Sequence, residues 1–227
     1  MGKVQLSPSM MCADIFSLGD TVRLFEKHKI PFLHIDVMDG KFVPNLMMGT
    51  SEIKQLRAFS SIPLDIHLMI EDPGEKLEWF EPKPGDYVSV HAETTCHLQR
   101  VLAKIRNLGA KPMAAVNPAT PLSMIEEIFP DTDAILVMCV NPGYAGQKLV
   151  PQTLDKIRRL RNMLDDRGFP DVEIEVDGNV TFENAVKMRK AGADIFVAGT
   201  SLLFRPGSME EHILNFYREM EKTGYSE

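Results

Sequence analysis

Eight short apolar runs alternate with amphipathic stretches along the chain, and this alternation limits the fold more than any other feature. The runs cover residues 4–9, 32–37, 62–68, 87–91, 113–116, 134–140, 173–176 and 194–197. Helical patterns follow them at 16–29, 49–60, 73–81, 95–109, 121–129, 151–168, 181–191 and 207–222. Short apolar runs joined by helices are typical of parallel strands buried on both faces. Eight such units predict a single (β/α)8 TIM barrel over residues 1–227.

An open, doubly wound sheet is the alternative architecture. It would need a glycine-rich dinucleotide-binding turn after the first strand. Here the first run leads into Ser9, Met10 and Met11, which cannot form such a turn. The sequence therefore favours the barrel.

Composition excludes several classes of partner. The net charge of −7 disfavours binding to nucleic acid or to an anionic membrane surface, and no apolar stretch is long enough to span a membrane. The cysteines Cys12, Cys96 and Cys139 are odd in number and far apart, which fits a reducing compartment and excludes a thiolate zinc site. We expect a cytoplasmic homo-oligomer.

Polar residues stand where nearly every apolar run ends. The set comprises Ser9, Asp36, His67, His91, Asn117, Asn141, Asp177 and Thr200. Any one of them could cap a loop. Catalytic residues of TIM barrels lie at the carboxyl ends of the strands, so the full set indicates an active site at that end.

His34 and Asp36 are two residues apart on one buried run, so both side chains leave on the same face. A buried histidine beside a helix-capping aspartate would explain this pair alone. A divalent cation would compensate the cost of burying them, and His67 and Asp177 could complete the site. Nitrogen and oxygen ligands suit Zn²⁺, Mn²⁺, Fe²⁺ or Co²⁺, so we predict one divalent metal ion per chain.

Asp36 and Asp177 come from runs far apart in the order, so they could approach a bound molecule from opposite faces. This arrangement moves a proton off one face of a carbon and returns it on the other, while a metal ion stabilises an enediolate. Met38, Met69 and Met138 lie at or just past run ends and could line the site, although ordinary core packing also explains them.

Glycine-bearing loops after the last three runs predict an anion site, because glycine lets backbone N–H groups approach a ligand closely. In TIM barrels the loops after the last two strands commonly bind phosphate. The predicted residues are Gly143, Tyr144, Ala145, Gly146, Gly178, Asn179, Gly199 and Thr200.

Motifs along nearly the whole chain resemble the ribulose-phosphate 3-epimerase family. They lie at residues 7–9, 34–40, 42–45, 67–69, 91–93, 141–143, 175–178 and 191–194. The resemblance implies interconversion of ribulose 5-phosphate and xylulose 5-phosphate on a barrel with one divalent metal. It implies His34, Asp36, His67 and Asp177 as ligands, with Asp36 and Asp177 as the two acid/bases. It also implies sugar contacts from Ser9 and His67, and phosphate contacts from the glycine loops.

Departures from the family pattern leave the length of the sugar open. Lys41 and Met47 replace a common His and Thr, and Ala145 replaces a glycine. Residues 10–14, Ala145 and 199–201 are similar to the allulose-6-phosphate 3-epimerase branch, so allulose 6-phosphate is the alternative substrate.

Two other classes fit less well. The related phosphate-barrel decarboxylases carry Lys and Asp where this chain has Met38 and Lys41. A non-catalytic phosphate-binding barrel would not need both Asp36 and Asp177.

Overall fold

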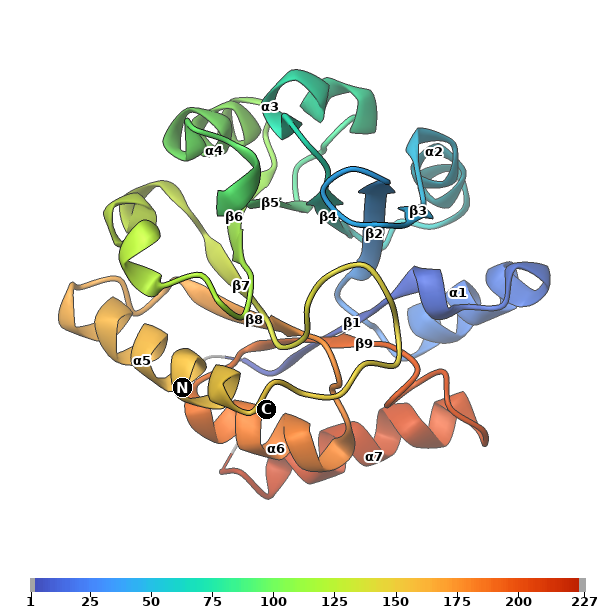
Figure 1. The fold of residues 1–227 in the computed structure, drawn as a ribbon. Coiled ribbons are helices and arrows are strands. Elements are labelled where there is room, and N and C mark those ends of the chain that lie inside the picture. Colours follow the sequence, from blue (N-terminus) through green and yellow to red (C-terminus); the bar gives the residue numbers. More distant parts are fainter. Residues whose placement is uncertain (1–2, 225–227) are drawn as a thin grey trace.

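The computed structural model describes residues 3–224 and contains one nine-stranded sheet, curled into a barrel and surrounded by helices (Figure 1). Its order is β1-β9-β8-β7-β6-β5-β4-β2-β3, and all pairs are parallel except that of β2 with β3. The strands are β1 (Gln5–Pro8), β2 (Leu33–Asp39), β3 (Leu46–Met47), β4 (Leu64–Met69), β5 (Tyr87–His91), β6 (Lys111–Val116), β7 (Ala134–Met138), β8 (Glu173–Asp177) and β9 (Ile195–Ala198).

Closure of the ring joins the first two parallel strands. Ser9, just after β1, forms an isolated parallel bridge with His34 of β2. The eight parallel strands thus form the predicted (β/α)8 barrel. Because they run the same way, their carboxyl ends share one rim of the barrel.

Seven α-helices cover the outside of the barrel in the described chain. They are α1 (Leu18–Lys27), α2 (Thr50–Phe59), α3 (Pro73–Lys76), α4 (Leu98–Asn107), α5 (Gln152–Asp166), α6 (Phe182–Ala191) and α7 (Met209–Glu221). Helix α6 illustrates the local signals: the Thr181 hydroxyl accepts a bond from Asn184 N–H at 3.0 Å, and Gly192 ends the helix at φ +114°. Each of these helices except the four-residue α3 buries several apolar side chains on one face.

Two predicted helices and one loop differ from expectation. Residues 121–129 form 3₁₀ turns (Leu122–Met124 and Glu126–Asp131) because Pro130 lacks the N–H that an α-helix needs. The stretch 73–81 is one α-turn followed by the 3₁₀ helix Leu77–Phe80. The short strand β3 was not predicted, since it has only two residues.

Successive strand residues alternate between an apolar outer face and a mixed inner face, which is apolar at Met113, Ala115 and Leu136 and polar on β2, β4 and β8. Ile35 of β2 and Ile66 of β4 are fully buried in the layer that packs under the helices. Their neighbours His34 and His67 are also fully buried, but on the opposite face of the same strands. The barrel interior therefore carries ionisable groups near one end.

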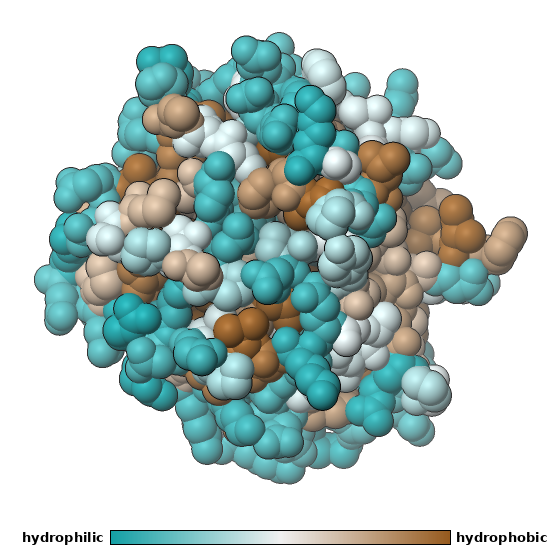
Figure 2. Space-filling view, viewed as in Figure 1, coloured by the Kyte–Doolittle hydropathy of each residue, from teal (hydrophilic) through white to brown (hydrophobic). Residues whose placement is uncertain are grey.

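Figure 2 shows the molecule from the same side, with apolar side chains gathered at the edge beside α1. Ile15 is 77% exposed and Phe16 is 97% exposed, just before that helix. No helix among residues 3–224 combines the length and the apolar character that crossing a bilayer requires.

Candidate metal centre and active site

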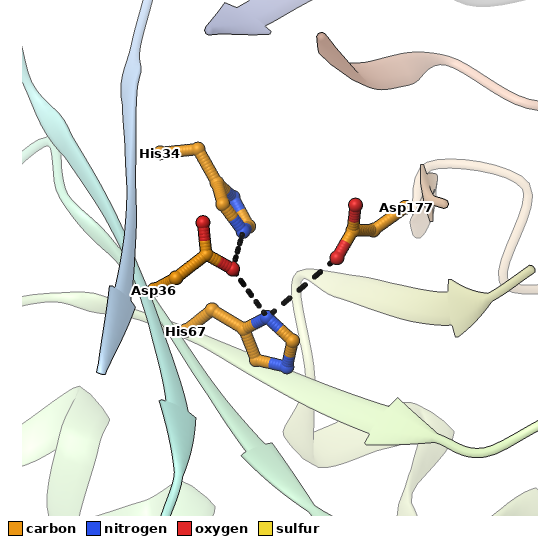
Figure 3. A group of neighbouring side chains, drawn as sticks. All are labelled: His34, Asp36, His67 and Asp177. Atoms are coloured by element: carbon orange, nitrogen blue, oxygen red, sulfur yellow. Dashed lines mark ion pairs between the residues drawn. The ribbon is translucent and has the colours of Figure 1, made fainter. Parts of the chain in front are cut away.

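Four side chains from three strands converge at the rim of the barrel (Figure 3). His34 and Asp36 come from β2, His67 from β4 and Asp177 from β8, and their donor atoms lie within 4.8 Å of one another. Asp36 Oδ1 is 3.4 Å from His34 Nε2 and 3.7 Å from His67 Nδ1. His67 Nδ1 is 3.9 Å from Asp177 Oδ2. The structure thus brings together the four residues predicted as ligands.

Two nitrogens of this group have no hydrogen-bond partner, and they provide a test of whether a metal ion fits. His34 Nε2 and His67 Nδ1 are both buried and unpaired, although each faces a carboxylate of the group. Leaving a buried polar atom unpaired costs about 1–3 kcal/mol, so such atoms call for a ligand. Two imidazole nitrogens with two carboxylates are a donor set that suits a divalent metal ion. The residues fit the predicted group.

A layer of buried polar residues beneath the four orients His34. Its Nδ1 lies 2.6 Å from Asp65 Oδ2, which also accepts a bond from the Ser7 hydroxyl at 2.8 Å. Glu175 Oε1 lies 3.3 Å from the same Nδ1. A carboxylate behind a histidine fixes the ring and directs its other nitrogen at the site.

Ser7, Asp65 and Glu175 were not predicted as site residues, although the sequence contains a signal for them. Each stands two residues before a residue that was predicted, namely Ser9, His67 and Asp177 in turn. Residues two apart on a strand share a face, so the inner face of a barrel is built in layers. One step back along each strand would have located this second layer.

His67 is supported in a different way. Its Nε2 lies 2.8 Å from His91 Nε2, and His91 Nδ1 lies 3.2 Å from Glu93 Oε2. Burial lowers the pKa of His91 to about 4. Burial alone would raise the pKa of Glu93, but hydrogen bonds from His91, Thr120 and the Asn117 N–H lower it to about 2. At neutral pH, His91 is therefore neutral and Glu93 is ionised.

The two carboxyl groups at the rim differ in their affinity for protons. Burial raises the pKa of Asp177, and the nearby charge of Asp36 raises it further, to about 7. Burial also opposes ionisation of Asp36, but His34 and His67 outweigh it and hold the pKa of Asp36 well below its usual range. Near neutral pH and without a metal ion, Asp36 is therefore a carboxylate while Asp177 can hold a proton.

A cavity above the four residues joins them to the glycine loops. Its walls include residues that were predicted for the site: Ser9, Asp36, Met38, Met69, Met138, Gly143, Tyr144, Ala145, Gly146, Asp177, Gly178, Asn179, Gly199 and Thr200. His34 and His67 lie fully buried beneath this cavity and do not line it. The Ser9 hydroxyl donates to Asp36 Oδ2 at 2.7 Å. Met11, Cys12 and Gln147 also line the cavity. Their residue types alone did not indicate that they belong to the site.

The loop between β7 and α5 crosses the mouth of the barrel, drawn in gold in Figure 1. Gly143 and Gly146 have φ values of +126° and +80°, in the region that favours glycine. The Asn45 side-chain amide donates to the Gly143 carbonyl at 3.0 Å, which ties this loop to the one after β2. The loop thereby closes one side of the cavity.

Comparison with known proteins gives a match that covers the barrel. The model of the ribulose-phosphate 3-epimerase family matches residues 5–203. The chain belongs to this family. It is 41% identical over 199 residues to a ribulose-phosphate 3-epimerase of Bacillus subtilis, covering 88% of this chain and 92% of that protein. It is 38% identical over 207 residues to that of Escherichia coli K12, covering 91% and 92%. The chain is accordingly an enzyme of the isomerase class.

Solved structures extend the likeness of the fold to other barrels. A crystal structure of 3-keto-L-gulonate-6-phosphate decarboxylase from Vibrio cholerae superposes with a TM-score of 0.71, covering 98% of this chain and 99% of that one. Only 11% of residues are identical, so the likeness concerns the fold alone. Met38 and Lys41 stand where that type of decarboxylase was expected to carry Lys and Asp.

Proposed function

We propose that the protein is a metal-dependent 3-epimerase that interconverts D-ribulose 5-phosphate and D-xylulose 5-phosphate. The observation that carries this proposal is the placement of Asp36 and Asp177 around one cavity, beside two unpaired histidine nitrogens. Family membership and the names of the relatives support the substrate.

His34, Asp36, His67 and Asp177 would hold the metal ion, for which Zn²⁺, Fe²⁺, Mn²⁺ and Co²⁺ are the candidates. When bound, the ion supplies a Lewis acid that stabilises negative charge on the sugar oxygens as an enediolate develops. A metal ion held by these four residues would lie beside the carboxyl groups of both Asp36 and Asp177.

The proton transfers belong to the two aspartates. One takes the proton from C3 of the sugar, and the other returns a proton to C3 from the opposite face, which inverts that carbon. Each aspartate is therefore the base in one direction of the reaction and the acid in the other. The Ser9 hydroxyl fixes the orientation of Asp36 through its bond to Oδ2. The thioethers of Met38, Met69 and Met138 exclude water without exchanging protons.

The phosphate would be bound by backbone amides of the loops that follow β7, β8 and β9. Gly143, Gly146, Gly178 and Gly199 line this part of the cavity, with Thr200 beside them. Binding energy from a remote phosphate helps to hold C3 between the two aspartates.

D-Allulose 6-phosphate is a second candidate substrate, because the residues shared with that branch lie at the cavity. Cys12 and Ala145 both line it, and Cys12 Sγ lies 3.8 Å from Ser9 Oγ. One additional CHOH group changes affinity by about 1–3 kcal/mol in a roomy pocket.

The test is kcat/KM for ribulose 5-phosphate and allulose 6-phosphate, measured side by side. We expect a preference for the pentulose. A hundredfold preference for the hexulose would replace the first proposal by the second, and no proton exchange at C3 of either sugar would refute both.

The cellular setting is also proposed. Cys12, Cys96 and Cys139 are free thiols, which supports a reducing compartment such as the cytoplasm. The proposed pentulose phosphate substrate supports a role in pentose phosphate metabolism. We propose a homo-oligomer, in agreement with the exposure of Ile15 and Phe16. Light scattering of the purified protein measures the mass, and a monomer at all concentrations would contradict this.

A further inference from the structure

The imidazole of His67 has a hydrogen-bonded neighbour outside the metal centre. His67 Nε2 and His91 Nε2 lie 2.8 Å apart, and both rings are fully buried. Two nitrogens at this distance share one hydrogen, so one ring donates and the other accepts. Which ring donates decides where the remaining hydrogen of His67 resides.

Glu93 is the fixed end of this chain of hydrogen bonds. Its Oε1 accepts the backbone N–H of Asn117 at 2.9 Å and the hydroxyl of Thr120. Lys156 holds the same loop, because its ammonium donates to the carbonyls of Asn117, Pro118 and Thr120 at 2.8, 2.7 and 2.7 Å. An ionised carboxylate only accepts hydrogen bonds. The Glu93 end can therefore accept a hydrogen from His91 but cannot donate one.

The acceptor role of Glu93 fixes which group donates in the bonds from His91 to Glu93 and between His67 and His91. Because Glu93 Oε2 accepts, the hydrogen of neutral His91 lies on Nδ1, 3.2 Å away. His91 Nε2 then carries a lone pair, so His67 Nε2 must donate to it. A neutral His67 has only one hydrogen. Its Nδ1 is therefore left with a lone pair that faces Asp36 and Asp177, and this is the nitrogen without a partner.

We propose that Glu93 and His91 are positioning residues that set the tautomer of His67, so that Nδ1 is ready to bind the metal ion. This inference rests on the proposed metal centre. Hydrogen bonds behind a metal ligand typically change metal affinity by about 10- to 100-fold. Glu93 acts on His67 through His91, whereas Asp65 touches its histidine directly.

Glu93→Gln is the informative variant, because the loop dictates how the new amide must point. The Asn117 N–H can only donate, so the glutamine oxygen takes the place of Oε1 and its NH₂ group faces His91. The hydrogen of His91 then moves to Nε2, and His67 must accept there. The hydrogen of His67 is thereby transferred to Nδ1, which blocks the metal-binding nitrogen.

Long-range ¹H–¹⁵N NMR on the metal-free protein at neutral pH identifies the nitrogen that carries each hydrogen. We expect His67 Nε2–H and His91 Nδ1–H in the wild type, and the reverse in Glu93→Gln. Wild-type protein with hydrogen on His67 Nδ1 would overturn the proposal, whatever the variant does. Because the wild type alone decides this point, failure of the variant to fold leaves the test intact.

Competition between the protein and a chelator for Zn²⁺ supplies the second measurement. The variant should bind Zn²⁺ about 10- to 100-fold more weakly, while the melting temperature of the metal-free protein changes little. Glu210→Gln is the matched control, since Glu210 accepts from His28 Nε2 at 2.9 Å on the outer surface. Unchanged Zn²⁺ affinity in Glu93→Gln would refute the proposal. Neither measurement uses a sugar phosphate. If both give the expected results but the protein has no epimerase activity, only the proposed function is refuted.

Discussion

The two ends of the cavity differ in whether side chains or backbone groups face the ligand. At the end where the metal ion is proposed to bind (the metal end), side chains supply the functional atoms; three of the four are buried, and hydrogen bonds from a second layer orient the histidines. At the end proposed to bind phosphate (the phosphate end), glycine-bearing loops line the cavity, and Gly143, Gly146 and Gly178 have positive φ. The metal end should therefore be sensitive to the chemistry of a side chain, even when its shape is kept. The phosphate end should be sensitive to added volume and to backbone strain.

The largest effect is expected at the metal end from changes that preserve shape. Asp36→Asn and Asp177→Asn should each lower kcat by about 10²- to 10⁴-fold, because an amide cannot accept and return a proton. Each variant should still exchange the C3 proton of one epimer with solvent, since one face keeps its carboxyl group. Elemental analysis must accompany the kinetics because both residues are proposed ligands. The exposed Asp20→Asn serves as control, and full activity in either site variant would refute the two-base mechanism.

Loss of the nitrogen ligands should remove the metal ion itself. We expect about one equivalent of a divalent metal in the gently purified wild type. His34→Ala and His67→Ala should each lower this occupancy, whereas the exposed His97→Ala should not. Inductively coupled plasma mass spectrometry measures the content. Stoichiometric metal in the double variant would contradict the ligand assignment.

The pH dependence of metal uptake should separate the two ends further. Burial disfavours a charged His34, but Asp65 and Asp36 outweigh it and raise its pKa well above the usual value. The pKa of Asp177 is about 7. Both groups must lose a proton to bind a metal ion, so affinity should rise with pH. Each proton released contributes about tenfold per pH unit, with two protons below pH 7 and one above it.

Calorimetry in buffers of different ionisation enthalpy counts these protons. The phosphate end offers a built-in control, because its backbone amides do not titrate. Affinity for inorganic phosphate should follow only the ionisation of phosphate itself. Metal affinity that does not vary with pH would contradict the assignment of His34 and Asp177 as ligands.

The smallest effect is expected from substitution of two glycines at the phosphate end. A Cβ at Gly178 would lie 2.6 Å from a Val140 methyl carbon and 2.8 Å from its backbone nitrogen, at a φ of +110°. A Cβ at Gly146 would meet no atom within 4 Å, although its φ is +80°. Gly178→Ala should displace the loop and raise KM by about tenfold, or 1.4 kcal/mol of binding. Gly146→Ala should cost only the left-handed strain of about 1–2 kcal/mol in stability. Equal effects of the two substitutions on KM would argue against binding of the phosphate by backbone amides.

The barrel and the main residues of the candidate site could be predicted from the sequence, because both depend on short-range periodicity. Alternating runs predicted the barrel, and the two-residue period placed His34 and Asp36 on one face. The failures were local as well: Pro130 and the short stretch after Pro73 favoured 3₁₀ turns over the expected helices.

Only the tertiary structure decided which side chains meet across strands. Asp65 was visible in the sequence, but its bond to His34 Nδ1 depends on the register between β2 and β4. The chain from Glu93 through His91 to His67 joins a loop to two strands, and its direction depends on every partner of Glu93. Hydrogen bonds act over about 3 Å, so positions that differ by one step of register exchange all their partners. Strand periodicity therefore determined which residues are the proposed ligands, while the three-dimensional packing decided what orients them.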